Sequence, residues 1–382
     1  MKRICAVTGS RADWGLLRPV LRQLQAAPVG LQVLVTGSHL DPRFGNTVDA
    51  IIDDGFTIDA RVPLSGRTDD AQGIADATGH ALSGICQSLL RLRPDTLLVL
   101  GDRYEIFAAA QAALITRIPV AHIAGGDVSE GAYDDAMRHA ITKLAHLHFT
   151  TNPDAQRRVL QMGEAQQRVF MTGSSGIDAL LETPRWSRAQ LQDKLGFDLR
   201  AKNLAITFHP ATLDPLPPVE QITALLDALD RFGDDTGLIF TGTNADTGGQ
   251  AINDAIQRFV DARDNACFLQ SLGQAGYYSL VEQADLVVGN SSSGLYEVPS
   301  LETPTLDIGM RQQGRLRGPS VRHVDTDATA IREAIEDILH NPPRDFINPY
   351  GDGSASERIV AALLAIEDPQ ALLVKHFVER PL

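Results

Sequence analysis

This chain has fewer basic than acidic side chains. The 382 residues include 34 Lys and Arg against 48 Asp and Glu, which gives a formal net charge of −14. A nucleic-acid backbone or an anionic membrane attracts a positively charged surface. The charge balance therefore argues against both kinds of partner, although local arginines can still bind a small anion.

Cysteines and long apolar runs are also scarce. The three cysteines, Cys5, Cys86 and Cys267, lie far apart among apolar residues. Disulfide frameworks and zinc sites need paired spacings, so we expect buried thiols in a reducing compartment. No apolar run has the length of a membrane span, and the apolar segment before Ser10 is too short for the core of a signal peptide. We predict a cytoplasmic protein.

Short apolar runs that end in Gly, Ser or Asp alternate with longer helical patterns. Such alternation is typical of parallel βαβ units in an α/β fold. A chain of 382 residues exceeds the usual size of one hydrophobic core. We predict two Rossmann-like domains facing a cleft, at residues 1–180 and 200–365, with a C-terminal helix at 366–382 that packs back on the first. The expected strands are 4–7, 31–35, 96–100, 120–123 and 169–172 in the first domain, and 204–208, 238–241, 286–288 and 305–308 in the second.

A loop of small residues, 289–297, follows the apolar run 284–288. When a strand ends in glycine and serine and a helix then begins, free backbone N–H groups and the positive end of a helix dipole favour an anion. Glu297 is suited to accept hydrogen bonds from a ribose diol, as an acid does in dinucleotide folds. The pattern indicates a nucleoside diphosphate. The alternative is a Ser-capped helix with an acidic first turn.

Charged residues follow two strands of the first domain, at the edge where parallel sheets bind ligands. Arg11 comes after the first strand and suits a diphosphate, unless it is a solvated loop residue. Asp102 and Arg103 come directly after the strand 96–100. They indicate a catalytic acid beside a phosphate-binding cation, with a structural ion pair as the alternative.

The segment 122–139 holds the densest group of titratable side chains in the chain. Its three glycines allow close approach of a ligand, and its carboxylates, Asp127 among them, can transfer protons if burial tunes their pKa values. We expect His122 and His139 to be structural rather than metal ligands. His209 follows a strand of the second domain, and we expect it to face the same cleft.

Together these segments resemble the hydrolysing UDP-N-acetylglucosamine 2-epimerases. The matches run in order through both domains, from residue 9 to about 317. They are Gly9-Ser10-Arg11-Ala12-Asp13, Leu100-Gly101-Asp102-Arg103, His122-Ile123-Ala124-Gly125-Gly126-Asp127, Asp134-Asp135, Arg138 to Lys143, Phe208-His209-Pro210, Asn290 to Gly294 with Glu297, and Arg311-Gln312 with Gly314-Arg315.

The resemblance implies the two-domain GT-B fold, with UDP bound in the cleft mainly against the second domain. It implies that Arg11 and Arg103 assist the diphosphate, that Glu297 takes the ribose hydroxyls and that Arg311 lies by the uracil. The full set of expected UDP-binding residues is Arg11, Arg103, Ser291, Ser292, Ser293, Gly294, Glu297 and Arg311. The expected catalytic residues are Asp102, Asp134 and His209, with Asp127 as a further candidate.

The implied reaction starts with loss of the C2 proton and anti departure of UDP to give a glycal. Water then adds at C1 while C2 is reprotonated on the opposite face, which yields N-acetylmannosamine, or a 2-epimerised analogue, and UDP for sialic-type nonulosonic acid synthesis. These steps require no metal or redox cofactor. The expected partners are a UDP-sugar and further copies of the chain, in a homodimer or homotetramer.

One position departs from the family pattern. Members of the sialic acid pathway carry a Glu two residues after the His of the His-Ile segment, where this chain has Ala124. Asp127 or Glu130 could replace that carboxylate. Alternatively, the added space favours a larger sugar, UDP-2,4-diacetamido-2,4,6-trideoxyglucose of legionaminic acid synthesis. Alternatives of another class are a GT-B glycosyltransferase and a non-catalytic UDP-sugar sensor.

Overall fold

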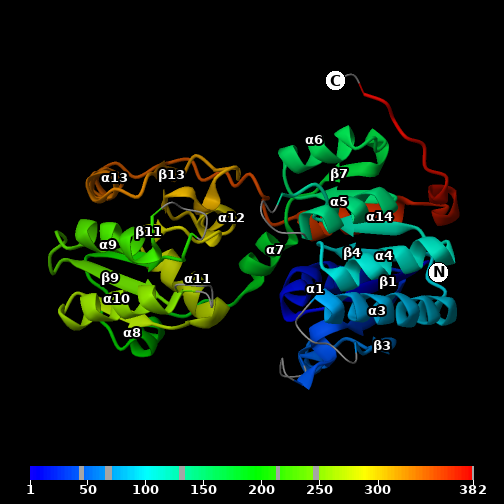
Figure 1. Cartoon of the computed structure of the whole chain (residues 1–382), viewed down its shortest axis with the longest axis horizontal. Coiled ribbons are helices and arrows are strands. Elements are labelled where there is room, and N and C mark those ends of the chain that lie inside the picture. Colours follow the sequence, from blue (N-terminus) through cyan, green and yellow to red (C-terminus); the bar gives the residue numbers. More distant parts are fainter. Residues whose placement is uncertain (43–46, 65–70, 129–133, 212–215, 244–248, 381–382) are drawn as a thin grey trace. The chain divides into compact units, whose positions relative to one another are not determined.

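The computed structural model describes residues 1–42, 47–64, 71–128, 134–211, 216–243 and 249–380. The chain divides into two compact units. Unit 1 combines residues 1–181 with residues 350–382, and unit 2 is the continuous segment 182–349. Figure 1 shows that each unit is a sheet covered by helices.

Unit 1 contains a seven-stranded parallel sheet in the order β3-β2-β1-β4-β5-β6-β7. The order reverses between β1 and β4, where open α/β sheets commonly bind ligands at the carboxyl ends of the strands. The strands are β1 (Arg3–Thr8), β2 (Gly30–Thr36), β3 (Ala60–Val62), β4 (Thr96–Leu100), β5 (Val120–Ile123), β6 (Leu147–Thr150) and β7 (Val169–Met171).

The helices of unit 1 cover both faces of its sheet. Along β1, Ile4 and Ala6 pack in a core with α1 and α14, whereas Cys5 and Val7 pack in another core with α3, α4 and α5. This division follows from the two-residue repeat of a strand whose faces are both buried. The helices are α1 (Arg11–Ala26), α2 (Val48–Asp53), α3 (Ala71–Leu92), α4 (Tyr104–Thr116), α5 (Asp134–Leu144), α6 (Pro153–Gln161), α7 (Ser175–Glu182) and α14 (Ala355–Ala365).

Unit 2 contains a six-stranded parallel sheet in the order β10-β9-β8-β11-β12-β13. Its largest core lies between the sheet and the helices α9, α10 and α13. The strands are β8 (Lys202–Thr207), β9 (Thr236–Thr241), β10 (Ala266–Leu269), β11 (Leu286–Gly289), β12 (Thr305–Ile308) and β13 (Val321–Val324). The helices are α8 (Arg188–Leu195), α9 (Pro218–Leu229), α10 (Gly249–Asp261), α11 (Gly273–Gln283), α12 (Ser293–Tyr296) and α13 (Ala328–His340).

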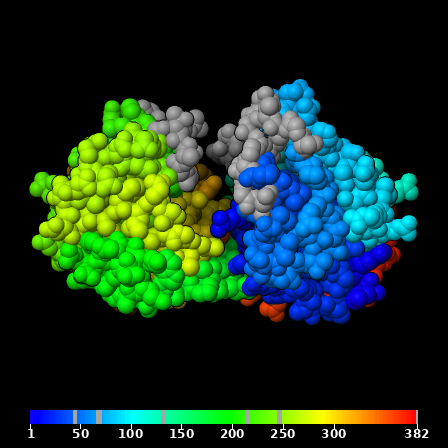
Figure 2. Space-filling view, turned by 90° about the horizontal axis from the view of Figure 1, so that it is seen from below, coloured from blue at the N-terminus to red at the C-terminus, as the bar shows by residue number. Residues whose placement is uncertain are grey.

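The C-terminal segment corrects two of the sequence predictions. The second unit ends at Pro349, not at residue 365, and α14 belongs to unit 1, where it packs against α1. The helix expected at 366–382 is reduced to one 3₁₀ turn, Pro369–Leu373. Residues 374–380 have no regular structure and contact the rest of unit 1, for example through the Val378 N–H and the Gly163 carbonyl at 2.9 Å. Figure 2 also shows red C-terminal residues on unit 1.

All nine expected strands are present, with ends that differ by at most two residues. The sequence prediction missed β3, β6, β10 and β13. The three cysteines are free, with Cys5 buried and the other two partly buried. Within the ranges that the structure describes, no helix has the length and apolar character needed to cross a membrane.

Candidate active site

Asp102 lies in the turn after β4, where Gly101 takes a positive φ of 80° that favours glycine. Its carboxylate accepts a hydrogen bond from the guanidinium of Arg138, a buried residue of α5. The Asp102–Arg138 contact joins the β4 turn to α5, and within α5 Arg138 Nη1 also lies 3.6 Å from Asp135 Oδ1. The position and orientation of the Asp102 carboxylate are thereby fixed.

Asp134 is the first residue of α5 and lies one helical turn before Arg138. Burial, together with the negative charge of Asp102, raises the pKa of Asp134. A carboxyl group with a raised pKa exchanges protons more readily near neutral pH than an ordinary one. The structure therefore places two expected catalytic carboxylates close enough to interact.

His122, on β5, contacts both the turn before Asp102 and helix α5. Its Nε2 donates to the Gly101 carbonyl at 2.8 Å, and the Thr142 hydroxyl lies 3.3 Å from Nδ1. Burial lowers the pKa of His122 to about 3, so the imidazole is neutral. A neutral ring that holds the turn before Asp102 agrees with the expected structural role.

Asp127 makes contacts that organise the chain itself. Its Oδ1 accepts hydrogen bonds from Thr151 at 2.6 Å and from Asn152 at 2.9 Å, which connects the loop after β5 to the start of α6. Burial raises the pKa of this carboxyl group. The contacts favour a structural role over the predicted catalytic one. Glu130, the other candidate in this loop, lies outside the described residues.

The glycines in this loop also allow close packing within the protein. A Cβ on Gly125 would lie 2.9 Å from His122 Nδ1, and one on Gly126 would collide with the Ala155 carbonyl. These two glycines are therefore needed for contacts within the chain, and the expected close approach of a ligand stays a prediction. Gly131, the third glycine of the segment, is outside the described residues.

The two arginines expected at the diphosphate differ in their surroundings. Arg11 is exposed at the start of α1. Arg103 donates through Nε to the fully buried Glu105 at 2.6 Å, while 41% of its side-chain surface stays exposed. Glu105 also helps burial to raise the pKa of nearby Asp13 to about 6. A buried carboxylate thus fixes one side of the Arg103 guanidinium.

In unit 2, Glu297 lies among hydroxyl groups. The Tyr278 hydroxyl donates to it at 3.0 Å, and the neighbouring Tyr277 hydroxyl lies 2.6 Å from Ser293 Oγ. Ser293 Oγ in turn lies 3.2 Å from Ser291 Oγ. Burial raises the pKa of Glu297. The predicted ribose acceptor and two of the predicted phosphate-binding serines therefore belong to one polar group carried by α11 and the loop after β11.

The helix after this loop is a single turn. α12 has four residues, and Glu297 caps its C-terminal end instead of lying in its first turn. The Gly294 N–H bonds to the Ser291 carbonyl at 3.2 Å, and the Ser292 carbonyl accepts from Leu295 and Tyr296. A single turn has little macrodipole, so a helix dipole contributes less at this loop than the sequence suggested. Hydroxyl groups and Arg311 supply further donors near the loop.

His209 and Arg311 both depend on Asn290. His209 is buried after β8, and its backbone N–H donates to the Asn290 side chain at 2.7 Å. Arg311 Nη1 donates to the Asn290 backbone carbonyl at 3.1 Å. Ser291, Glu297, His209 and Arg311 thus follow β8, β11 and β12, three adjacent strands of the same sheet.

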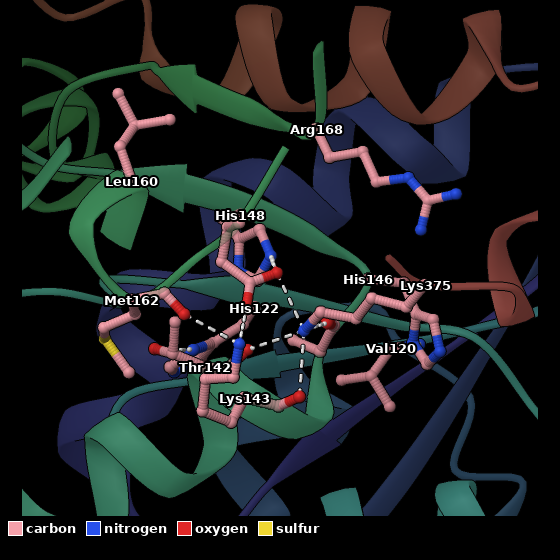
Figure 3. Close-up of polar contacts among 12 residues, drawn as sticks. Val120, His122, Thr142, Lys143, His146, His148, Leu160, Met162, Arg168 and Lys375 are labelled. Carbon is pink, nitrogen blue, oxygen red and sulfur yellow. Dashed lines mark hydrogen bonds and ion pairs between the residues drawn. The ribbon is translucent and has the colours of Figure 1, made fainter. Parts of the chain in front are cut away.

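A second charged cluster lies at the other end of α5 (Figure 3). Buried Glu164 contacts Lys143 at 2.5 Å, Lys375 at 2.8 Å and His148 at 3.0 Å. Lys375 Nζ also donates to the carbonyls of Lys143 and Ala145, at 2.8 and 2.7 Å. The cation thus satisfies carbonyls at the C-terminal end of α5.

Sequence reasoning missed several residues that support the predicted ones. Arg138 was visible as part of a motif four residues after Asp134, a spacing that puts both on one face of a helix. Glu105, Tyr277 and Tyr278 had no such signal. In the described part of the chain, no three His, Cys, Asp or Glu side chains are grouped to hold a metal ion.

The family model for UDP-N-acetylglucosamine 2-epimerase matches residues 22–364. The chain belongs to this family. A Legionella pneumophila protein named UDP-N,N'-diacetylbacillosamine 2-epimerase (hydrolyzing) is 35% identical over 367 residues, and the match covers 96% of each chain. Polysialic acid biosynthesis protein P7 of Escherichia coli is 38% identical over 336 residues, which are 88% of this chain and 85% of that protein.

The family's fold is present as well. The crystal structure of UDP-GlcNAc 2-epimerase from Neisseria meningitidis bound to UDP-GlcNAc has a TM-score of 0.78 at 21% identity, over 95% of this chain and 99% of that one. Two parallel-sheet α/β domains of this GT-B-like type agree with the predicted fold class. The family resemblance stated from the motifs is confirmed.

Proposed function

We propose that this protein hydrolyses a UDP-N-acetylhexosamine with inversion at C2, releasing UDP and the free 2-epimerised sugar. The observation that carries the proposal is the pair of carboxylates, Asp102 and Asp134, which lie close enough to interact at the carboxyl ends of the strands of unit 1, with Arg138 of the same helix as Asp134 bound to Asp102. Family membership and the hydrolysing relative from Legionella support it.

The first step is an elimination. One carboxylate takes the C2 proton, the C–H electron pair forms the C1–C2 double bond, and the C1–O bond breaks so that UDP leaves with its electrons. Asp134 suits this transfer because its pKa is raised. Arg103 and Arg11 would stabilise the charge that develops on the diphosphate.

The second step adds water. Its oxygen bonds to C1 and gives up one proton to a carboxylate base, while the electron pair of the C1–C2 double bond takes a proton from a second acid on the opposite face of C2. Asp102, oriented by Arg138, and His209 are the proposed groups for these transfers. In unit 2, Glu297 would accept hydrogen bonds from the ribose, the serines would donate to the phosphates, and Arg311 would lie by the uracil.

Isotope labelling tests this reaction. Turnover in deuterated water should leave deuterium at C2, and turnover in oxygen-18 water should place the label at C1, since both steps draw on solvent. Mass spectrometry of the products from a panel of UDP-HexNAc sugars reads both. An intact UDP-sugar as the only product would contradict hydrolysis, transfer to an acceptor alone would favour a glycosyltransferase, and binding with no product would favour a sensor.

A 2,4-diacetamido-2,4,6-trideoxy sugar is the second candidate substrate. Ala124 supports it, because a methyl group replaces a larger acidic side chain expected in sialic-pathway members, and the Legionella relative's name also supports it. Pocket volume of this kind gives discrimination of about 1–3 kcal/mol.

Substitution of Ala124 separates the two sugars. Ala124→Glu should remove a preference for the diacetamido sugar, measured as the ratio of kcat/KM values. Ala124 has a φ of +64°, so Ala124→Gln is a matched control that bears similar backbone strain without the charge. A wild type that strongly prefers UDP-GlcNAc would contradict the volume argument.

The predicted cytoplasmic location and the homodimer or homotetramer are proposals as well. Three free cysteines support a reducing compartment. Light scattering after size-exclusion chromatography measures the assembly, and a monomer at micromolar concentration would contradict it.

A further inference from the structure

Asn290 joins two segments that carry proposed functional groups. The register pairs Gly289 with Thr207, so β11 and β8 end side by side in the sheet of unit 2. Asn290 follows Gly289 directly, and His209 lies two residues after Thr207. The Asn290 N–H still bonds to the Thr207 carbonyl at 3.2 Å, so the two chains stay together beyond their strands.

The side chain of Asn290 continues the pairing where the backbone ladder stops. Its Oδ1 accepts from the His209 N–H at 2.7 Å, and its Nδ2 donates to the His209 carbonyl at 2.8 Å. Both bonds go to one residue, so they fix the direction of the His209 peptide groups. Asn290 is 1% exposed, and breaking a buried bond of this kind leaves a polar group unsatisfied.

The backbone carbonyl of Asn290 binds a third segment. It accepts from Arg311 Nη1 at 3.1 Å and from buried Gln312 Nε2 at 2.8 Å. One residue therefore contacts the end of β8 through its side chain and the loop after β12 through its main chain. The two connections use different atoms, so a substitution of the Asn290 side chain changes the contact with His209 and keeps the backbone contact with Arg311 and Gln312.

We propose that Asn290 is a positioning residue that sets the place of His209 for the reaction. The proposal rests on the proposed function, because it assigns importance to His209 through that chemistry. Replacing the Asn290 side-chain amide should therefore lower turnover more than it lowers UDP affinity. The substitution keeps the Asn290 backbone carbonyl, which is the group that Arg311 contacts.

The chain provides a matched control at the amino end of β8, the strand that His209 follows. Asn203, near the start of β8, accepts from the Arg200 N–H at 2.9 Å and donates to the Arg200 carbonyl at 3.0 Å. It is 2% exposed, so it makes the same two bonds in a similar environment. Its position at the amino end of β8 is remote from the residues that follow the strand.

The experiment compares Asn290→Asp with Asn203→Asp in the full-length protein. Each substitution keeps the acceptor oxygen and replaces the donor NH₂ by oxygen, which then faces a carbonyl. Both variants should lose a similar amount in Tm. Asn290→Asp should lower kcat at least tenfold and change the Kd of UDP, measured by calorimetry, less than threefold, whereas Asn203→Asp should leave kcat within twofold.

A double-mutant cycle tests whether the effect passes through His209. In a His209→Ala background, Asn290→Asp should lower kcat less than twofold further. An equal loss in both backgrounds, or a kcat near wild type in Asn290→Asp, would overturn the proposal. Asn290→Ser removes the amide without adding charge and gives the same test if the Asp variant does not fold.

Two further outcomes are decisive. If both Asn290 variants are unfolded while Asn203→Asp is folded, Asn290 serves folding and the proposal is wrong. If the wild type binds UDP but turns over none of the UDP-sugars, the proposed function fails instead, which is a separate result.

Discussion

The two ends of helix α5 each carry a group of charged side chains, and the groups differ in how well their carboxylates are paired. At the amino end, burial and the charge of Asp102 raise the pKa of Asp134. At the carboxyl end, three hydrogen-bond donors outweigh burial and lower the pKa of Glu164 to about 2. Burial acts in the same direction on both acids, so the number of cationic and hydrogen-bonding partners decides the outcome.

The comparison separates residues that perform chemistry from residues that hold the structure. A carboxyl group that must gain and lose a proton cannot be saturated with donors, because its ionised form would be too stable. Glu164 contacts Lys143, Lys375 and His148 and therefore remains ionised. The following substitutions test whether this division holds.

Asp102→Asn should cause the largest loss of activity. The amide keeps the shape of the side chain but cannot accept a proton, and loss of a general acid or base costs on the order of a hundredfold to ten-thousandfold in kcat. UDP affinity should be spared. Steady-state kinetics measures kcat, and calorimetry measures UDP affinity. Near-normal turnover would show that Asp102 has a structural role and not a catalytic one.

Glu164→Gln should produce the reverse pattern. Removing this buried charge leaves Lys375 and Lys143 without their anion, which costs about 3–5 kcal/mol in the free energy of unfolding. The folded fraction should keep a kcat close to wild type. Urea denaturation measures the stability, and a loss of kcat at full folding would show that the two ends of α5 are coupled.

The same variant gives a prediction for pH. Because folding lowers the pKa of Glu164 from 4.5 to about 2, its stabilisation is present above pH 4.5 and is lost as pH falls toward about 2. The difference in unfolding free energy between wild type and Glu164→Gln should therefore shrink over this acidic range. A difference that is constant from pH 7 to pH 3 would contradict the assignment.

Glu297→Ala extends the comparison to unit 2. Glu297 has a raised pKa and accepts from Tyr278, so it is expected to act in binding rather than in support of the fold. We expect UDP affinity to fall by about 1–3 kcal/mol, measured by calorimetry. Tyr278→Phe is the companion variant and should have a smaller effect. Unchanged UDP affinity in Glu297→Ala would refute the ribose contact.

Lys143→Met should have the smallest effect. Its side chain is 40% exposed, whereas that of Lys375 is 19% exposed, although both contact Glu164. An ion pair with a solvated partner contributes about 0–1 kcal/mol. Urea denaturation of Lys143→Met and Lys375→Met compares the loss of unfolding free energy in the two variants. Equal losses would show that the exposure of the lysine does not decide the contribution of its ion pair.

The sequence predicted the strands that are buried on both faces and missed most of those at the sheet edges. β1, β4, β8 and β11 appear as short apolar runs because helices cover both sides. β3, β10 and β13 are edge strands, and β6 is a central strand of four residues with His148 in the middle. A short strand has only a weak periodic signal. β5 and β12 are also four residues long and were predicted, so length alone does not explain why β6 was missed.

The candidate site was predictable where a motif carries the residues. Asp102 follows a strand, Asp134 begins a helix, and Glu297 lies at the end of the small-residue loop after β11, and these positions are visible in the sequence. The supporting contacts were not, because Asn290 and His209 are 81 residues apart and Lys375 and Ala145 are 230 apart. The apolar residues near the C-terminus suggested a helix, but hydrogen bonds from Arg168 to the Leu372 and Val374 carbonyls hold that segment in another conformation.

The Lys375 contacts also set the order in which the protein can be completed on the ribosome. Unit 2 is a continuous segment, so it can fold as soon as residue 349 has emerged. The carbonyls at the end of α5 gain their hydrogen bonds only after Lys375 has been made, 230 residues later than Ala145. Unit 1, although translated first, is therefore finished last, and a nascent chain stalled before residue 375 holds a complete second domain beside an unfinished first one.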